Sequence, residues 1–263
     1  NSDWAIKQLQ FIFPQRNESV WRAAFGSYLQ SNHRSIKIFE ILRDEYKYAL
    51  DNLYLLMGTE DGESDVVDRL SQNLFIYYLW DVYPLTGEAS LLERFYSKTN
   101  GDRKRWAQLF NNIGRSLKSS SPDLEQSLTD RAIAFFDWRF KQAEPLELQK
   151  FSFWLEAECL DPEWRLRSYS KVLSFGPGED FGFSFQVRSL HKLLPYHQSL
   201  VVECFSKITD IMGQQSLMYI LAKDAKPILK SGLNSDNMHV RKNAERAREN
   251  LLRFGSFEYL DLE

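Results

Sequence analysis

Cysteine is scarce in this chain of 263 residues, which has only Cys159 and Cys204 and no pair in C-x-x-C spacing. Two thiols so placed exclude a disulfide framework and a cysteine-rich zinc module. They predict a reduced, cytoplasmic protein. Long hydrophobic runs are also missing, since the longest, Leu74 to Trp80, falls far short of the ~20 residues that span a bilayer. The sequence therefore predicts no membrane partner.

A basic excess is absent as well. Lysine and arginine number 33 against 36 aspartates and glutamates, a net charge of −3. A dedicated nucleic-acid binder usually carries a strong basic surplus, so this balance does not favour nucleic acid as the partner. Alternating apolar and polar residues typical of strands are missing too, and glycine and proline are few, at 12 and 8. These absences favour an all-α protein.

Helical periodicity with a spacing of three to four residues recurs along almost the whole chain. Some fourteen helices are expected, joined by short loops. The expected helices include 3–13, 18–29, 35–57, 102–117, 124–141, 147–158, 163–173, 183–194, 197–212 and a short one near 216–222. This pattern predicts an antiparallel helix-hairpin array, a HEAT-like α-α superhelix or degenerate solenoid.

The stretch from Asp224 to Gly255 shows the expected repeat unit most clearly. Pro227 suits the first turn of one helix, and the polar turn 234–236 offers capping oxygens to the next. Gly255 fits a helix C-cap. Because a single helix pair cannot bury its own apolar faces, this unit implies similar neighbours, with residues 257–262 covering the open end.

The domain organisation expected from the sequence is a single α-helical repeat domain over 1–263, excised from a larger protein. The loop from Lys118 to Asp123 separates two expected lobes, 1–118 and 123–263.

Candidate chemical motifs are weak. The six-residue spacing of His191 and His197 places them on different helix faces, unlike zinc ligands. Glu156 and Glu158 diverge on a helix and are expected to be solvated charges. The loop at 175–182, FGPGEDFG, lacks the Lys-Ser/Thr of a P-loop. The sequence therefore predicts no catalytic residue, no cofactor and no metal.

The most basic local stretch is Arg103, Lys104 and Arg105, which could contact phosphate groups, although a solvated helix end is the favoured interpretation. Together with Arg139 and Arg241, these three residues form the predicted binding set, provided that they meet on one surface.

Four segments resemble a bacterial family: VWRAAFGSYL at 20–29, IAFFDWRF at 133–140, FSFWLEAECLDPEWRLRSYSKVL at 151–173 and LLRFGSFEYLDL at 251–262. In this order they look like the α-helical C-terminal domain, of unassigned activity, found downstream of sirtuin-like or STAND NTPase modules in bacterial antiphage proteins. The resemblance implies a non-catalytic recognition, scaffold or oligomerisation role, with catalysis in an N-terminal module. The implied partner is a protein or another module of the same polypeptide.

A second hypothesis is an alkylpurine DNA glycosylase, another HEAT-like class that uses a Trp, an Asp and an Arg. Here two sets supply these residue types: Asp137, Trp138 and Arg139, or Asp161, Trp164 and Arg165. Nucleic acid is the less favoured partner because the chain is weakly acidic.

Overall fold

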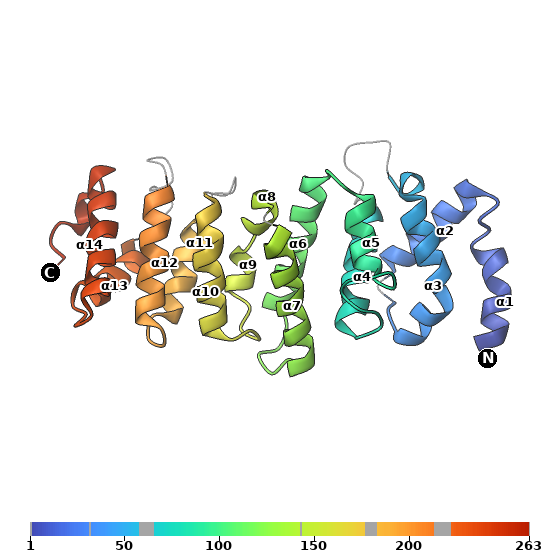
Figure 1. Cartoon of the computed structure of the whole chain (residues 1–263), viewed down its shortest axis with the longest axis horizontal. Helices are drawn as coiled ribbons and strands as arrows, with labels where there is room; N and C mark the ends of the chain where they lie inside the picture. The colour runs from blue at the N-terminus through green and yellow to red at the C-terminus, as the bar shows by residue number, and fades with distance from the viewer. Residues whose placement is uncertain are drawn as a thin grey trace. The chain divides into compact units, whose positions relative to one another are not determined.

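The structure is a computed structural model that describes residues 2–31, 33–57, 66–142, 144–176, 183–212 and 222–262. Every regular element in these ranges is helical and none is a strand, which confirms the predicted all-α class (Figure 1). Within the same ranges, every helix is too short or too polar to span a bilayer.

The helices of the described ranges are α1 (Ser2–Ile12), α2 (Glu18–Gln30), α3 (Ile36–Asp51), η1 (Leu53–Leu55), α4 (Val66–Leu79), α5 (Leu91–Lys98), α6 (Arg103–Lys118), α7 (Gln126–Gln142), α8 (Pro145–Leu148), α9 (Ser152–Leu155), α10 (Pro162–Val172), η2 (Leu173–Phe175), α11 (Phe183–Leu193), α12 (Gln198–Ile211), α13 (Ala222–Leu233), α14 (Met238–Arg253) and η4 (Phe257–Tyr259).

Two compact units make up the chain. The first unit comprises Asn1–Leu109 with Gln126–Trp138, and the second comprises Phe110–Glu125 with Arg139–Glu263. The division passes through α6 and α7, whereas the sequence predicted lobes that meet at the loop 119–122.

The side chains of α6 explain this division. Trp106 packs against Tyr96 of the first unit with ring centroids 5.3 Å apart, while Phe110 stacks on Trp154 of the second at 4.9 Å. One helix thus contributes to two cores. Trp106 and Phe110 lie on the same face of α6 but one turn apart along its axis, so each meets a different neighbour.

The second unit repeats one packing pattern. Helices two apart along the chain pack against each other, as α10 does with α12, α11 with α13 and α12 with α14, and α12 also contacts α11 and α13 (Figure 1). Two of these helices approach closely at Gly232 of α13, where an added Cβ would lie 2.6 Å from the Cβ of Ala244 on α14. This neighbour-to-neighbour packing fits the predicted array of helix hairpins.

The end of the second unit follows the expected capping logic. Gly255 has a φ of +92°, and the amide of Ser256 donates to the carbonyl of Leu251, which satisfies a carbonyl at the end of α14. Tyr259 of η4 is buried, and Arg248 Nη1 donates to the Leu262 carbonyl at 2.7 Å. The final segment therefore covers part of α14.

The first unit has an aromatic core. Phe39 packs on Tyr77 with centroids 4.6 Å apart, and the hydroxyl of Tyr28 lies 3.2 Å from those of both Tyr46 and Tyr77. Such rings provide large apolar area and still need a partner for each hydroxyl. Here the three tyrosine hydroxyls satisfy one another.

Some local predictions were wrong. The helix predicted over 147–158 is two single turns, α8 and α9, because the intervening residues form turns around the buried Phe151. Pro227 lies inside α13, not in its first turn. The N-cap of α14 is Asn237, whose side chain accepts from the amide of His239 at 2.9 Å. The short helix predicted near 216–222 falls almost wholly outside the described residues.

Candidate functional site

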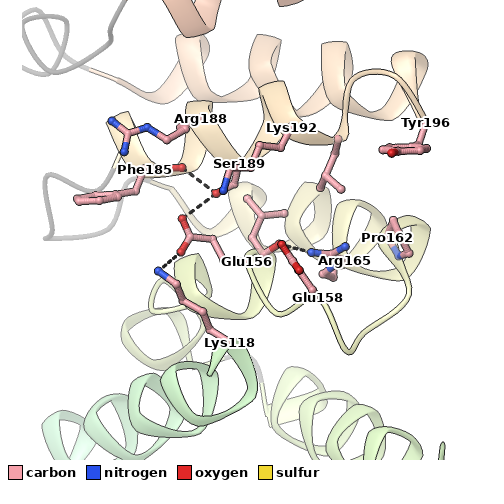
Figure 2. A pocket seen from close by; sticks show the side chains of 12 residues that line it. Lys118, Glu156, Glu158, Pro162, Arg165, Phe185, Arg188, Ser189, Lys192 and Tyr196 are labelled. Carbon is pink, nitrogen blue, oxygen red and sulfur yellow. Dashed lines mark hydrogen bonds and ion pairs between the residues drawn. The ribbon is translucent and has the colours of Figure 1, made fainter. Parts of the chain in front are cut away.

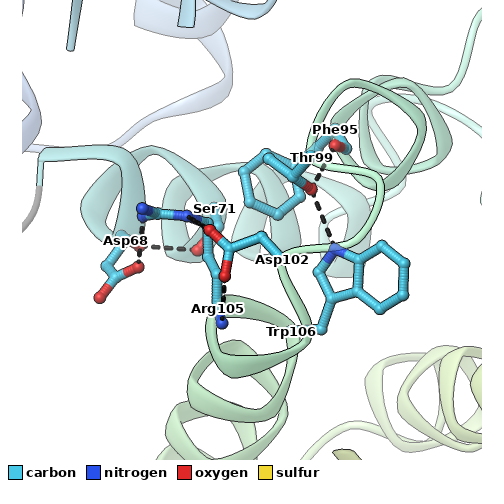
Figure 3. Close-up of polar contacts among 7 residues, drawn as sticks. All are labelled: Asp68, Ser71, Phe95, Thr99, Asp102, Arg105 and Trp106. Carbon is cyan, nitrogen blue, oxygen red and sulfur yellow. Dashed lines mark hydrogen bonds and ion pairs between the residues drawn. The ribbon is translucent and has the colours of Figure 1, made fainter. Parts of the chain in front are cut away.

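Arg105, from the basic stretch predicted to bind, takes part in internal ion pairs (Figure 3). Its Nη1 donates to Asp68 Oδ1 of α4 and its Nε to Asp102 Oδ2, both at 2.9 Å. Asp102 also accepts from the backbone amide of Arg105 at 3.1 Å and so caps α6. Arg105 therefore joins the start of α6 to α4.

The neighbouring Trp106 belongs to the core of the first unit. Its Nε1 donates to Thr99 Oγ1 at 2.9 Å, and that hydroxyl donates to the Phe95 carbonyl at 2.8 Å (Figure 3). Since its indole is buried, it offers no stacking platform to a base. Arg103 and Lys104 have exposed side chains.

Arg139, the fourth residue of the predicted binding set, is buried against Glu147. Their exposed fractions are 3% and 1%, and the guanidinium donates Nε to Oε1 at 2.8 Å and Nη2 to Oε2 at 2.6 Å. In this fork geometry the carboxylate of Glu147 pairs with the buried guanidinium charge, and both residues belong to the second unit. Arg139 is thus unsuited to contacting a phosphate, whereas Arg241 is exposed on α14.

The structure therefore removes Arg139 from the predicted binding set, because its side chain is enclosed. Arg103, Lys104 and Arg105 lie in the first unit, and Arg139 and Arg241 lie in the second, with Arg139 enclosed. The second set of glycosylase-type residues has a structural role as well: Asp161 is the N-cap of α10 and accepts from the amide of Trp164 at 2.7 Å.

A pocket of about 660 Å³ in the second unit gathers a different set of charged side chains (Figure 2). The end of α6, the turn after α9, and helices α10 and α11 provide its walls. The charged residues that line it are Lys118, Glu156, Glu158, Arg165, Arg188 and Lys192. We call this the α10–α11 pocket.

Glu156 is fully engaged within the α10–α11 pocket. Lys118 forms an ion pair with its Oε2, and Ser189 of α11 donates to its Oε1 at 2.9 Å (Figure 2). The charges of Lys118 and Glu156 therefore cancel locally, and the pair joins α6 to the turn after α9. Glu158, two residues on, is exposed.

Arg165 of α10 lies at the base of the same pocket and is only 5% exposed. Its Nη1 donates to the Leu155 carbonyl at 3.0 Å, while its Nε is buried without a hydrogen-bond partner. Burial lowers the pKa of the guanidinium, and the charge of Glu158 partly opposes this shift.

Two aromatic side chains flank the pocket from α11 and the turn that follows it. Phe185 is 58% exposed and Tyr196 is 74% exposed, and both line the pocket (Figure 2). Arg188 lies over the Phe185 ring, 5.8 Å from its centroid, and its Nε is 3.8 Å from Asp224 Oδ2. The pocket thus combines charges with accessible rings.

The predicted binding set did not include Arg165, Arg188 or Lys192, although Arg165 was named in the second set of glycosylase-type residues. The spacing of Arg188 and Lys192 by four residues on one helix face was a usable signal. The burial of Arg165 was not readable, because it depends on how α10 packs against the turn after α9.

The other sequence candidates do not assemble into a reactive centre. His191 Nδ1 lies 3.2 Å from Asp224 Oδ1, an ordinary polar contact between α11 and α13. The described residues contain no cluster of three or more His, Cys, Asp or Glu side chains that could hold a metal ion. Most of the 175–182 loop lies outside the described residues.

Comparisons with known proteins do not assign this chain to a family. No protein-family model and no curated protein matches the chain. A solved structure of an engineered protein aligns over 95% of this chain and 97% of its own, with 14% identity and a TM-score of 0.29. A likeness at that score supports no argument about fold or function.

Proposed function

We propose that this chain is a non-catalytic helical recognition domain that binds a segment of a protein, either a separate partner or another module of the same polypeptide. The observation that supports the proposal is the α10–α11 pocket, which combines two strongly exposed aromatic rings, Phe185 and Tyr196, with charged side chains. Exposed aromatic and arginine side chains are the residues that most often supply binding energy at protein interfaces.

The packing pattern agrees with this role. Helices α10 and α11, which line the pocket, both pack against α12, so its walls are held by a shared neighbour. A rigid wall limits the entropy lost on binding, which favours recognition. The expected place of the domain in a bacterial antiphage protein rests on the sequence resemblance alone and stays a prediction.

Site-specific photo-cross-linking in the native host tests the proposal. A benzophenone amino acid replaces Tyr196 in one variant and Phe185 in another. A third variant carries it at Tyr54, an exposed tyrosine of the first unit with a similar exposed fraction of 61%. We expect both pocket positions to cross-link to the same protein segment, identified by mass spectrometry.

The position at Tyr54 is the matched control, because it has comparable exposure and does not line the α10–α11 pocket. Identical products from all three positions would indicate random collisions. The absence of a discrete product from both pocket positions would indicate that nothing binds there. Either outcome would reject the recognition role of this pocket.

A further inference from the structure

Arg165 is a buried cation with unused hydrogen-bonding capacity. A guanidinium has five N–H donors. The structure gives this one a single acceptor, the carbonyl of Leu155 at 3.0 Å, and leaves its Nε buried without a partner. No carboxylate of the described residues forms an ion pair with it.

Such an arrangement is costly in a protein interior. Buried charges are normally paired and hydrogen-bonded, because the surrounding atoms replace water poorly. Arg139, in the same unit, shows the usual solution, with both oxygens of Glu147 facing its guanidinium. Arg165 lacks that carboxylate and opens onto a pocket instead.

The charged side chains of the pocket that remain after internal pairing are mostly positive. Lys118 and Glu156 neutralise each other, and Arg188 is paired with Asp224 of α13, which leaves Arg165 and Lys192 against the single carboxylate of Glu158. Lys192 is exposed and is not ion-paired in the described part of the chain. An excess of one positive charge therefore lines the pocket, and the Arg188–Asp224 pair lies beside it.

We infer that the α10–α11 pocket binds an oxyanion, a phosphate or carboxylate group, that hydrogen-bonds Arg165 and is attracted by Lys192 and Arg188. Planar guanidinium groups bind such groups through two parallel N–H donors, and an ammonium acts as an additional point charge. The inference rests on the proposed recognition role of the same pocket and names the chemical group that it recognises.

Titration of the purified chain with sodium phosphate tests the inference. The Nε–Hε signal of Arg165 is followed by heteronuclear NMR, and sodium chloride of equal ionic strength serves as the reference. We expect a saturable shift of this signal with phosphate alone. Arg165→Met should weaken phosphate binding, followed through backbone amides of α10 and α11, by tenfold or more, and Lys192→Ala by about threefold.

Arg167→Met is the matched control. Arg167 lies on the same helix, is 62% exposed and pairs with Glu163 outside the pocket. Phosphate affinity should not change in this variant. Thermal unfolding without phosphate gives a second readout: Arg165→Met should be as stable as the original chain or more stable, because it removes a buried unpaired charge.

The inference is overturned if phosphate produces no saturable shift, or if Arg165→Met binds phosphate as well as the original chain does. Lower stability of Arg165→Met with unchanged affinity would assign the residue a structural role instead. If Arg165→Met does not fold, Lys192→Ala decides, and unchanged affinity in that variant rejects the inference.

A hexaglutamate peptide, compared with inorganic phosphate, distinguishes the two sources of an oxyanion. Tighter binding of the peptide assigns the pocket to an acidic protein segment, and tighter binding of phosphate assigns it to a phosphorylated ligand. Either result supports the oxyanion class. Cross-linking from Tyr196 without any oxyanion binding would leave the recognition role standing and reject this inference alone.

Discussion

Replacing Gly232 by alanine tests whether close helix packing or helix propensity decides stability in the second unit. Gly232 is buried near the end of α13. A Cβ there would lie 2.6 Å from the Cβ of Ala244 and 3.1 Å from both methyl carbons of Val202. Carbon atoms normally stay ~3.5–4.0 Å apart, so the Gly232→Ala change forces α13 away from α14 and α12.

Two opposing contributions set the magnitude. Alanine gains at most about 1 kcal/mol over glycine in a helix, and less at a helix end. Overpacking a filled interface costs about 1–3 kcal/mol, and the upper part of that range applies because the Cβ of Ala244 is fixed to its backbone. The expected net effect is a loss of roughly 2 kcal/mol, which lowers Tm by roughly 4–8 °C.

Thermal and urea unfolding followed by circular dichroism measure this change. Gly26→Ala is the matched control, since Gly26 is also buried and helical, but its added Cβ would meet the methyl carbons of Val66 at 3.7 and 3.8 Å, an ordinary contact. That variant should therefore gain up to about 1 kcal/mol. A second change, Ala244→Gly, made in the Gly232→Ala background should restore part of the lost stability because it removes the closest clash.

The opposite result would refute the reasoning. If Gly232→Ala stabilises the chain as much as Gly26→Ala does, helix propensity outweighs packing at this position. If Ala244→Gly adds its own cost without any coupling, the contact between α13 and α14 is not as close as the structure shows.

Three further predictions concern buried groups. Glu147→Gln should lower the free energy of unfolding by about 3–5 kcal/mol because it removes the carboxylate charge that faces the buried guanidinium of Arg139, whereas adding Arg139→Met should recover most of the loss in urea titrations. Burial raises the pKa of Tyr78 and of Tyr259 to about 12, so the folded state holds these protons more tightly than the unfolded state does. The contribution of both tyrosines to the free energy of unfolding should thus be complete below pH ~10 and should fall as the pH rises towards 12. Absorbance at 295 nm measures their ionisation, and unfolding titrations at each pH measure the stability. Burial also raises the pKa of the Cys204 thiol, so iodoacetamide should leave it unmodified in the folded chain and label it once urea unfolds the protein.

Local signals were enough to predict most helices. The apolar spacing in 18–29 and 183–194 matches α2 and α11 within one residue at each end, and Gly255 follows the C-cap residue Phe254 of α14 with a left-handed backbone. The failures occurred where tertiary contacts override periodicity. Residues 147–158 have a helical apolar pattern, but burying Phe151, Trp154 and Leu155 together is achieved with two single turns.

The candidate site could be predicted less well than the fold. Composition and spacing drew attention to Arg103, Lys104 and Arg105, because clustered charges are visible in a sequence. Whether a charged side chain meets a carboxylate depends on residues far along the chain. Asp68 reaches Arg105 across 37 positions, and no local pattern indicates that Arg165 lacks such a partner.

The sequence by itself determined the helical class of this protein, since helix formation depends on apolar spacing, capping residues and the scarcity of glycine and proline within a short window. The tertiary structure decided which charges are neutralised and which remain available. Arg139 and Arg165 are both buried arginines, yet only Arg139 faces a carboxylate. That difference arises from the packing of helices against one another, because electrostatic pairing depends on distance in space and on exclusion of water.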